Sequence, residues 1–295
     1  GLPPFTALFA GERRLPRARS AGFVPDNAGD CQEHGGGWGK DGRWGHRYDL
    51  HFPAGVLLDG WTPDKAWDLV VVPHFPWVMN ILPIAAVDQA GRVLHTDIPA
   101  TYPLDPPTFG HFPQGTAWIE NALQDLDAPG KWALDVAGRQ LYLWPEGDGS
   151  PQGIVAPQCP QGIVAPALTE LIRVEGAIHA DGAQDEPVTG LVFRGLTFTH
   201  GDLYRWEPDK TGWGLQHDWE MFDKPTALLR LRGAERCVVE KCRFVNSAGA
   251  AIRLDLHAQH NAIRENLIAH NLIHHCPYTA IVASGRIYLD RQGIG

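Results

Sequence analysis

The chemistry that this sequence could perform centres on a few acidic side chains. Asp255, in the segment AIRLDL (251–256), stands where two similar segments have Glu175 and Arg232, and His257 follows it closely. A carboxyl group held near a second one can give or accept a proton while a bond is cleaved. Asp255 is therefore a candidate catalytic residue. The alternative is a solvated strand face, because this position is polar in all three segments.

A second group of candidates lies in an aromatic-rich segment at 201–225, GDLYRWEPDKTGWGLQHDWEMFDKP. Carboxylates accept hydrogen bonds from hydroxyl groups, and aromatic rings offer flat apolar faces to a ligand. Two acids here could partner Asp255, and their neighbours could bind the ligand: Asp218, Glu220, Trp213, His217 and Trp219. Alternatively, the tryptophans only fix a long loop to the rest of the fold.

Short repeated strands are expected to position these residues. Three segments share an order of aliphatic, Arg, aliphatic and polar residues, which is typical of a strand with one buried face. Arg230 and Arg253 are 23 residues apart, and Phe244 and Ile268 are 24 apart. A repeat of this length with Asn, Gly and Ser at its corners predicts the coils of a parallel β-solenoid. The three segments are LIRVEG (171–176), LLRLRG (228–233) and AIRLDL (251–256).

The segment NLIAHNLIHH (266–275) contains the same five-residue pattern twice. Both copies match the same position of the predicted repeat. Ile268 follows Phe244 by the 24-residue period, and Ile273 precedes Ile281 by 8 residues, as Phe244 precedes Ile252. We favour a junction where whole coils are missing, and the alternative is a local bulge. His275 is a further candidate for ligand binding. The other interpretation is a ladder of corner side chains that bond to each other.

Residues 1–168 show no such period and predict a separate module. Short β-like runs are separated by Pro- and Gly-rich turns, and DVAG (135–138) between two apolar runs predicts a hairpin. The segment AWIENALQDLDAP (117–129) predicts a helix that Pro129 ends. A β-sandwich-like module at 1–168 followed by the solenoid at 169–295 is the expected organisation.

Composition excludes several classes of protein. The net charge of −9 gives no basic surface for nucleic acid. There is no run of about 18 apolar residues that could span a membrane. The five cysteines form no C-x-x-C pair, so small buried thiols are expected rather than zinc ligands. A P-loop motif is also absent, which leaves P-loop nucleotide chemistry without support.

Several segments resemble the central part of large bacterial right-handed parallel β-helix proteins. These segments are FTALFAGERRLPRAR (5–19), WIENALQDLDAPGKWALDVAGRQLYLWP (118–145), LIRVEG (171–176) and FRGLTFTH (193–200). They are similar to glycoside hydrolase families 120 and 141, which include xylosidases, xylanases and fucosidases. The resemblance implies an all-β protein with a right-handed parallel β-helix after a β-sandwich-like module. It also implies a secreted or periplasmic location, and a chain that is shortened relative to these families.

The resemblance further implies a glycoside hydrolase that acts on xylan- or fucose-containing polysaccharides. Such enzymes place two carboxyl groups about 5–5.5 Å apart for retention or about 6.5–9.5 Å apart for inversion of configuration. Asp255 with Asp218 or Glu220 would be the carboxyl groups, and the sugar would contact side chains nearby. Those side chains are Trp213, His217, Trp219, His257 and His275. The reaction requires neither a cofactor nor a metal.

Two other functions stay open at this point. One is a polysaccharide lyase or epimerase on the same fold, since a fold does not fix a reaction. The other is a carbohydrate-binding fragment without catalysis. The expected partner is an oligosaccharide or polysaccharide in each case, and the oligomeric state is open.

Overall fold

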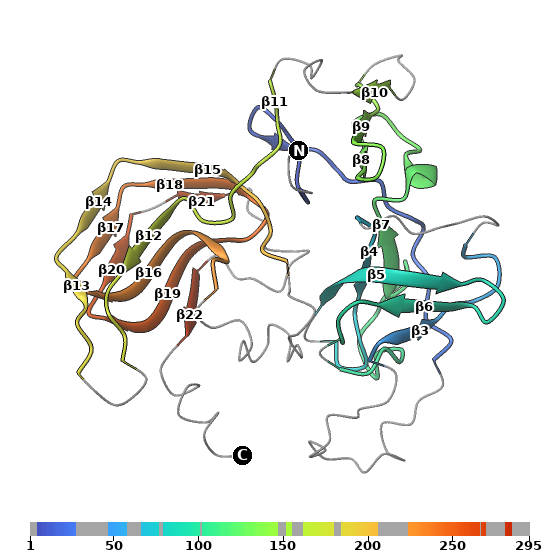
Figure 1. The fold of residues 1–295 in the computed structure, drawn as a ribbon, viewed down its shortest axis with the longest axis horizontal. Coiled ribbons are helices and arrows are strands. Elements are labelled where there is room, and N and C mark those ends of the chain that lie inside the picture. Colours follow the sequence, from blue (N-terminus) through green and yellow to red (C-terminus); the bar gives the residue numbers. More distant parts are fainter. Residues whose placement is uncertain are drawn as a thin grey trace, which may run out of the picture. The chain divides into compact units, whose positions relative to one another are not determined.

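A computed structural model of the 295-residue chain describes residues 5–27, 47–57, 66–76, 79–100, 102–146, 152–154, 162–179, 184–205, 224–265, 267–269 and 281–284. These residues form an all-β protein with one short 3₁₀ helix, and they separate into two compact units (Figure 1). The parallel-sheet unit contains residues 5–14, 162–205 and those described from 224 onward. The antiparallel unit contains the described residues from 15 to 154.

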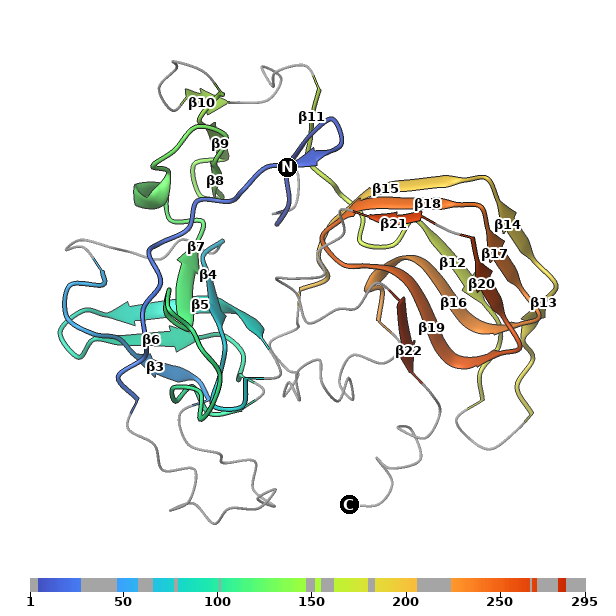
Figure 2. The same cartoon turned by 180° about the vertical axis from the view of Figure 1, so that it is seen from behind.

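The described part of the parallel-sheet unit contains three parallel sheets (Figure 2). The first has the order β12 (Ile172–Glu175), β16 (Ala227–Glu235), β19 (Ala250–Gln259) and β22 (Ile281–Ser284), with β13 (Val188–Thr189) also beside β16. The second has the order β14 (Val192–Arg194), β17 (Val238–Glu240) and β20 (Ala262–Arg264). The third has the order β15 (Thr197–Gly201), β18 (Arg243–Ser247) and β21 (Leu267–Ala269).

The strand registers confirm the repeat that the sequence predicts. Arg173 pairs with Arg230, and Arg230 pairs with Arg253, so the three similar segments are adjacent strands of one sheet. Phe244 likewise pairs with Phe198 on one side and with Ile268 on the other. The rings of Phe198 and Phe244 stack in the interior with their centroids 4.6 Å apart. Equivalent residues of successive repeats therefore lie one above the other.

The corners between the sheets use left-handed backbone conformations. His200 and Asn246 occupy equivalent positions at the end of the third sheet and have φ angles of 61° and 59°. Lys241 and Glu265 are equivalent residues before that sheet, and their φ angles are 52° and 55°. A left-handed residue costs about 1–2 kcal/mol, so a run of them at matching positions indicates a bend that every coil requires.

The duplicated segment at 266–275 lies mostly outside the described residues, but the strands on either side of it are described. Ile268, in its first copy, takes the expected position beside Phe244. β22 then pairs directly with β19, with Val282 opposite Arg253. These two residues are 29 apart in sequence, whereas Arg230 and Arg253 are 23 apart. The choice between missing coils and a local bulge stays open, because residues 270–280 lie outside the described ranges.

A small antiparallel sheet belongs to the same unit. It has the order β11 (Ile163–Val164), β1 (Phe9–Ala10) and β2 (Arg13–Arg14). Thr6 donates hydrogen bonds to Asp202 through its amide, at 3.0 Å, and its hydroxyl, at 2.6 Å. The division into units therefore differs from the expected boundary after residue 168, because the first strands of the chain group with the later repeats.

The antiparallel unit is built around a five-stranded sheet. Its order is β3 (Asp49–His51), β6 (Val93–Thr96), β5 (Asn80–Asp88), β4 (Asp68–Val71) and β7 (Ala117–Glu120). Apolar residues of this sheet, among them Leu69, Leu82 and Ile119, form its core. A second sheet has the order β10 (Gln152–Ile154), β9 (Gln140–Leu143) and β8 (Trp132–Asp135), and the pairing of β8 with β9 confirms the predicted hairpin.

The helix predicted at 117–129 is wrong. Residues 117–120 form β7, with Ala117 and Ile119 fully buried, and only η1 (Leu123–Asp125) is helical. The burial alternates with a period of two residues, which a strand satisfies and a helix does not. Asn121, with a φ of 73°, then ends the strand.

Cys237 and Cys242 are buried and form no disulfide, which confirms the expectation of small buried thiols for this pair. Within the described ranges, no helix has both the length and the hydropathy needed to cross a membrane.

Candidate active site

Asp255 lies on β19, on the face of its sheet opposite the apolar core. Ile252 and Leu254 contribute to the core cluster, so Arg253 and Asp255, which alternate with them along the strand, point the other way. Both side chains nevertheless have 0% of their surface exposed. The interpretation of Asp255 as a solvated face residue is therefore wrong.

Two arginines hold the Asp255 carboxylate. Its Oδ2 accepts one hydrogen bond from Arg230 Nε at 3.1 Å and another from Arg253 Nε at 3.0 Å. Arg253 also donates to Thr226 Oγ1 at 2.8 Å. The two guanidinium groups occupy equivalent positions on adjacent strands, so the carboxylate offsets the repulsion between two like charges that are stacked and buried.

Glu170 is a second acid at this network. Its Oε2 lies 3.7 Å from Arg230 Nη1 and its Oε1 lies 3.6 Å from Arg173 Nε, while its side chain keeps 13% of its surface exposed. Burial raises the pKa of Glu170, and the charges of Arg230 and Arg173 offset only part of that effect. Glu170 therefore keeps its proton to a higher pH than an ordinary glutamate and still reaches the surface.

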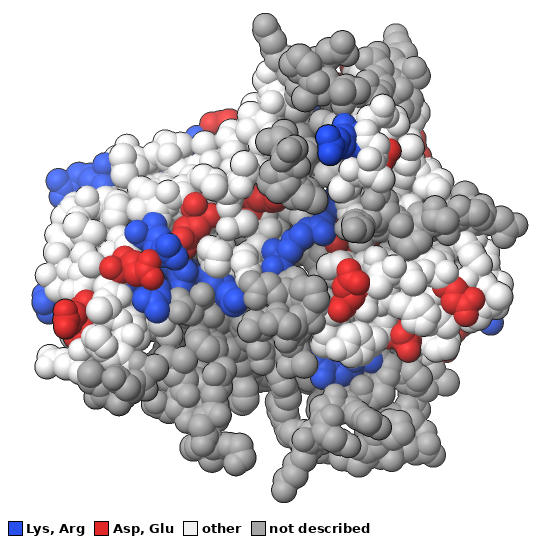
Figure 3. Space-filling model, in the orientation of Figure 1, with Lys and Arg blue, Asp and Glu red and all other residues white. Residues whose placement is uncertain are grey.

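The network continues into more exposed charges on β12 and β16. Arg173 Nε lies 3.0 Å from Glu175 Oε2, and Arg232 Nη1 lies 3.5 Å from Glu175 Oε1. Arg173 and Glu175 are about half exposed, at 49% and 46%. Figure 3 shows Lys or Arg side chains beside Asp or Glu side chains over these strands. A polar ligand that approached this surface would meet both signs of charge.

Glu170 and Asp255 are suited to different tasks. One is a partly exposed acid whose burial favours the protonated form, and the other is a fully buried carboxylate that bonds to two guanidinium groups. Both acids lie beside Arg230, at 3.7 Å for Glu170 and 3.1 Å for Asp255.

The described residues include only part of the predicted site. Asp255 is described, and so is the backbone of His257 within β19. The other predicted residues lie outside the described ranges, so their roles stay predictions: Trp213, His217, Asp218, Trp219, Glu220 and His275. The side chain of His257 is also outside the described part.

The sequence analysis missed Glu170 and the role of the arginines. The signal was present in LTELIRVEG (168–176), where Glu170 precedes Arg173 by three residues and Arg173 matches Arg230 in the repeat. If the alignment of the repeats begins one residue earlier, at position 170, Glu170 lies close to the aligned arginines Arg173, Arg230 and Arg253, here called the arginine column. A carboxyl group beside that column was therefore detectable, but its burial and pKa were not.

A metal site finds no support in the described part of the chain. No three His, Cys, Asp or Glu side chains gather there in a way that could hold a metal ion. The acids of the network face arginines, which occupy the positions that a cation would take.

Comparison with known proteins gives one structural likeness. No family model matches the chain, and no curated protein matches it. A solved structure named glycoside hydrolase matches it with a TM-score of 0.53 and 18% sequence identity. The match covers 88% of this chain and 46% of that one, so this chain spans less than half the length of its neighbour. The likeness shows a glycoside hydrolase-like fold.

Proposed function

We propose that this chain is the core of a glycoside hydrolase that cleaves a polysaccharide, in which Glu170 donates a proton to the glycosidic oxygen. The observation that carries the proposal is the partly exposed Glu170, whose pKa burial raises although Arg230 and Arg173 lie beside it. The likeness to a glycoside hydrolase fold supports the same reading, although fold alone does not fix a reaction.

The proposed reaction uses two carboxyl groups. The Glu170 proton passes to the bridging oxygen as the bond from that oxygen to the anomeric carbon breaks. A second carboxylate takes a proton from water, whose oxygen then bonds to the anomeric carbon. The sequence predicts Asp218 and Glu220 as partners of Asp255, and their role stays a prediction. The products are two shorter saccharides. Glu170 regains a proton from solvent, and the second carboxylate releases the one it took.

Asp255 is proposed as a positioning residue rather than a group that touches the sugar. Its side chain has no exposed surface, and both of its arginine partners are buried with it. Asp255 holds Arg230 in place through a hydrogen bond. Arg230 Nη1 in turn lies 3.7 Å from Glu170 Oε2, so Asp255 helps to set the electrostatic environment of Glu170. This role replaces the direct one expected from sequence, and it predicts that substitution of Asp255 shifts the pH dependence of activity.

The architecture that we infer is a right-handed parallel β-helix. The support is the three parallel sheets, whose strands recur in the order of the first, second and third sheet. The spacing is 23 or 24 residues between β16, β17, β18 and their partners β19, β20, β21. Left-handed residues at matching corners fit the same inference. We further propose that the antiparallel unit is the β-sandwich-like module and that the protein acts outside the cytoplasm, where polysaccharides are found.

The test is release of reducing sugar from a panel of xylans, pectins and fucosylated glycans. The parent chain is compared with Glu170→Gln and with Glu186→Gln, a matched change at an exposed glutamate of the same unit. We expect hydrolysis by the parent and by Glu186→Gln, and at least about a hundredfold loss in Glu170→Gln. An unsaturated product that absorbs ultraviolet light would indicate a lyase instead. Binding of a glycan without any product would indicate a non-catalytic module.

A further inference from the structure

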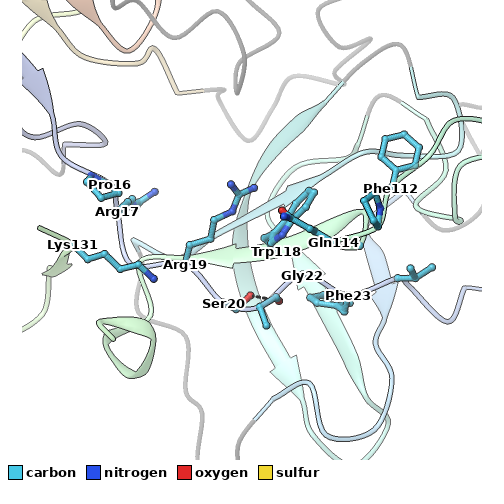
Figure 4. A pocket seen from close by; sticks show the side chains of 14 residues that line it. Pro16, Arg17, Arg19, Ser20, Gly22, Phe23, Phe112, Gln114, Trp118 and Lys131 are labelled. Atoms are coloured by element: carbon cyan, nitrogen blue, oxygen red, sulfur yellow. Dashed lines mark hydrogen bonds between the residues drawn. The ribbon is translucent and has the colours of Figure 1, made fainter. Parts of the chain in front are cut away.

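A groove of about 800 Å³ opens on the antiparallel unit (Figure 4). It is lined by the segment 16–24, by Trp118 on β7, by the turn at 112–115 and by Lys131. Arg17 and Lys131 lie toward one end of the groove in this view and Phe112 toward the other, with Arg19 and Trp118 between them. All of these residues lie in one unit, so the groove belongs to that unit alone.

The backbone around the groove is fixed by close packing. The segment 17–23 runs beside β7, where Ser20 and Phe23 donate amide hydrogen bonds to Ile119 and Ala117. At Gly22 a Cβ atom would lie 1.7 Å from the carbonyl oxygen of Gln114. At Gly115, where φ is +90°, it would lie 2.5 Å from the amide nitrogen of Phe23. These close approaches hold the groove in one shape without a ligand.

The polar atoms in the groove favour an anionic ligand. Its charged lining residues are Arg17, Arg19 and Lys131, all cations. Arg17 and Lys131 have carboxylate partners in Asp68 and Asp127. Arg19 Nε lies 3.7 Å from Glu120 Oε1, which is an ion pair but longer than a hydrogen bond. This Nε is buried and has no hydrogen-bond partner among the described residues. Burial also lowers the pKa of Arg19.

Aromatic and amide groups surround this arginine. The Arg19 guanidinium stacks on Trp118, with Cζ 4.4 Å from the ring centroid, so its planar fork is held in one orientation. Phe23 and Phe112 line the same groove, and Gln114 adds an exposed amide. A pre-oriented guanidinium matches a carboxylate, while rings and an amide match the faces and hydroxyl groups of a sugar.

We propose that this groove binds a saccharide that carries a carboxylate, such as a uronic acid residue, with the carboxylate on Arg19. A neutral sugar offers Arg19 no opposite charge, whereas a carboxylate can accept charge-assisted hydrogen bonds from it, so the acidic sugar is favoured. This is a binding site in the antiparallel unit, and it does not rest on the proposed hydrolytic function. Loss of hydrolysis in Glu170→Gln would leave it unchanged.

The test is isothermal titration of the full chain with a trisaccharide of galacturonic acid and, as the matched neutral probe, a trisaccharide of galactose. Arg19→Gln is the variant, and Arg139→Gln is the control, because Arg139 is an exposed arginine of the same unit in the turn between β8 and β9. Gln114→Ala is a second variant. Gln114 is exposed, so we expect this substitution to leave the stability of the fold unchanged. Thermal unfolding of each variant is measured in parallel.

We expect the parent and Arg139→Gln to bind the acidic trisaccharide at least about tenfold more tightly than the neutral one. Arg19→Gln should lose about tenfold in affinity for the acidic probe, and Gln114→Ala about threefold. Equal binding of both probes, no binding at all, or unchanged binding in a folded Arg19→Gln would overturn the proposal. Full competition by sodium sulfate at the affinity of the saccharide would also overturn it, because the site would then be a general anion site.

Discussion

Two clusters in the parallel-sheet unit each contain two arginines and one acid. The arginines of one cluster are buried, and those of the other are exposed to solvent. In the first sheet, Arg230 and Arg253 share the Asp255 carboxylate, and these side chains are 2%, 0% and 0% exposed. In the second sheet, Arg194 and Arg264 share the Glu240 carboxylate, and the two arginines are 64% and 57% exposed. Asp255 lies on the same strand as Arg253 and beside the strand of Arg230, whereas Glu240 lies on β17 between the strands of Arg194 and Arg264.

The difference teaches what each cluster can be for. Water screens the exposed arginines, so the cluster at Glu240 can add only a little to stability. The buried cluster carries a large desolvation cost, and its carboxylate is needed to offset two charges that have no access to water. Because desolvation of these three charges is unfavourable, we expect the buried cluster to serve a function. We propose that it positions Arg230 beside Glu170.

The largest expected effect is that of Asp255→Asn. The substitution removes the carboxylate that bonds to both buried guanidinium groups, so the free energy of unfolding should fall by about 3–5 kcal/mol. Urea unfolding followed by circular dichroism measures this. A loss below about 1 kcal/mol would mean that the arginines are solvated and that the two clusters do not differ.

Replacing the whole buried cluster sharpens the comparison. In the triple variant Arg230→Met, Asp255→Leu and Arg253→Met, no charge is left buried, so stability should return to within about 1–2 kcal/mol of the parent. Activity should not return, because Glu170 then lacks Arg230. Unfolding and sugar release are measured on the same preparation. A triple variant as active as the parent would contradict the positioning role.

Asp125, in the antiparallel unit, is an acid whose pKa is raised by burial and is not affected by an arginine. Burial and Asp127 raise its pKa to about 6, which Lys131 only partly opposes. The folded state therefore binds a proton more tightly than the unfolded state, so this group lowers stability as pH rises from about 4 to 6. Asp125→Asn should raise the melting temperature by about 1–3 °C at pH 7.

The control for this prediction is pH. Well below the ordinary Asp pKa of 3.8 the Asp125 carboxyl is protonated in both states, so the difference between parent and Asp125→Asn should vanish there. Differential scanning calorimetry across this range tests both the sign and the interval. A constant difference at every pH would show that the carboxyl charge is not the cause.

The smallest expected effect is that of Glu240→Gln. Hydrogen bonds from Arg264 and Arg194 lower the pKa of Glu240, so its contribution to stability is present at neutral pH and is lost as pH falls through that lowered pKa. At pH 7 the variant should be only slightly less stable than the parent, and the difference should shrink in high salt. A loss as large as that of Asp255→Asn would remove the contrast between the clusters.

The repeat could be predicted from the sequence because it depends on local alternation and on spacing. Arg230 and Arg253 pair as the 23-residue interval requires, and Phe244 pairs with Ile268. The failure at 117–129 has the opposite origin, because Ala and Leu favour a helix locally while pairing with β4 favours a strand. Tertiary pairing decided that segment, and nothing within it signals this.

The site was only partly predictable for a related reason. Asp255 stood out because its residue type changes within the repeat, but the pattern could not distinguish a solvated face from a buried one. Burial on the outward face of a sheet depends on what packs against it, which a strand pattern does not contain. The Glu170 pKa likewise depends on distances to Arg230 and Arg173.

The measurement that most directly tests the role of Glu170 is the rate of Glu170→Gln on two substrates of one sugar. One is the natural glycan that the panel identifies, and the other is an aryl glycoside whose leaving group needs no proton. A proton donor matters only for the first, so we predict at least about a hundredfold loss on the glycan and a near-parental rate of bond cleavage on the aryl glycoside. Equal losses on both substrates, or none on the glycan, would contradict the assignment of Glu170 as the proton donor.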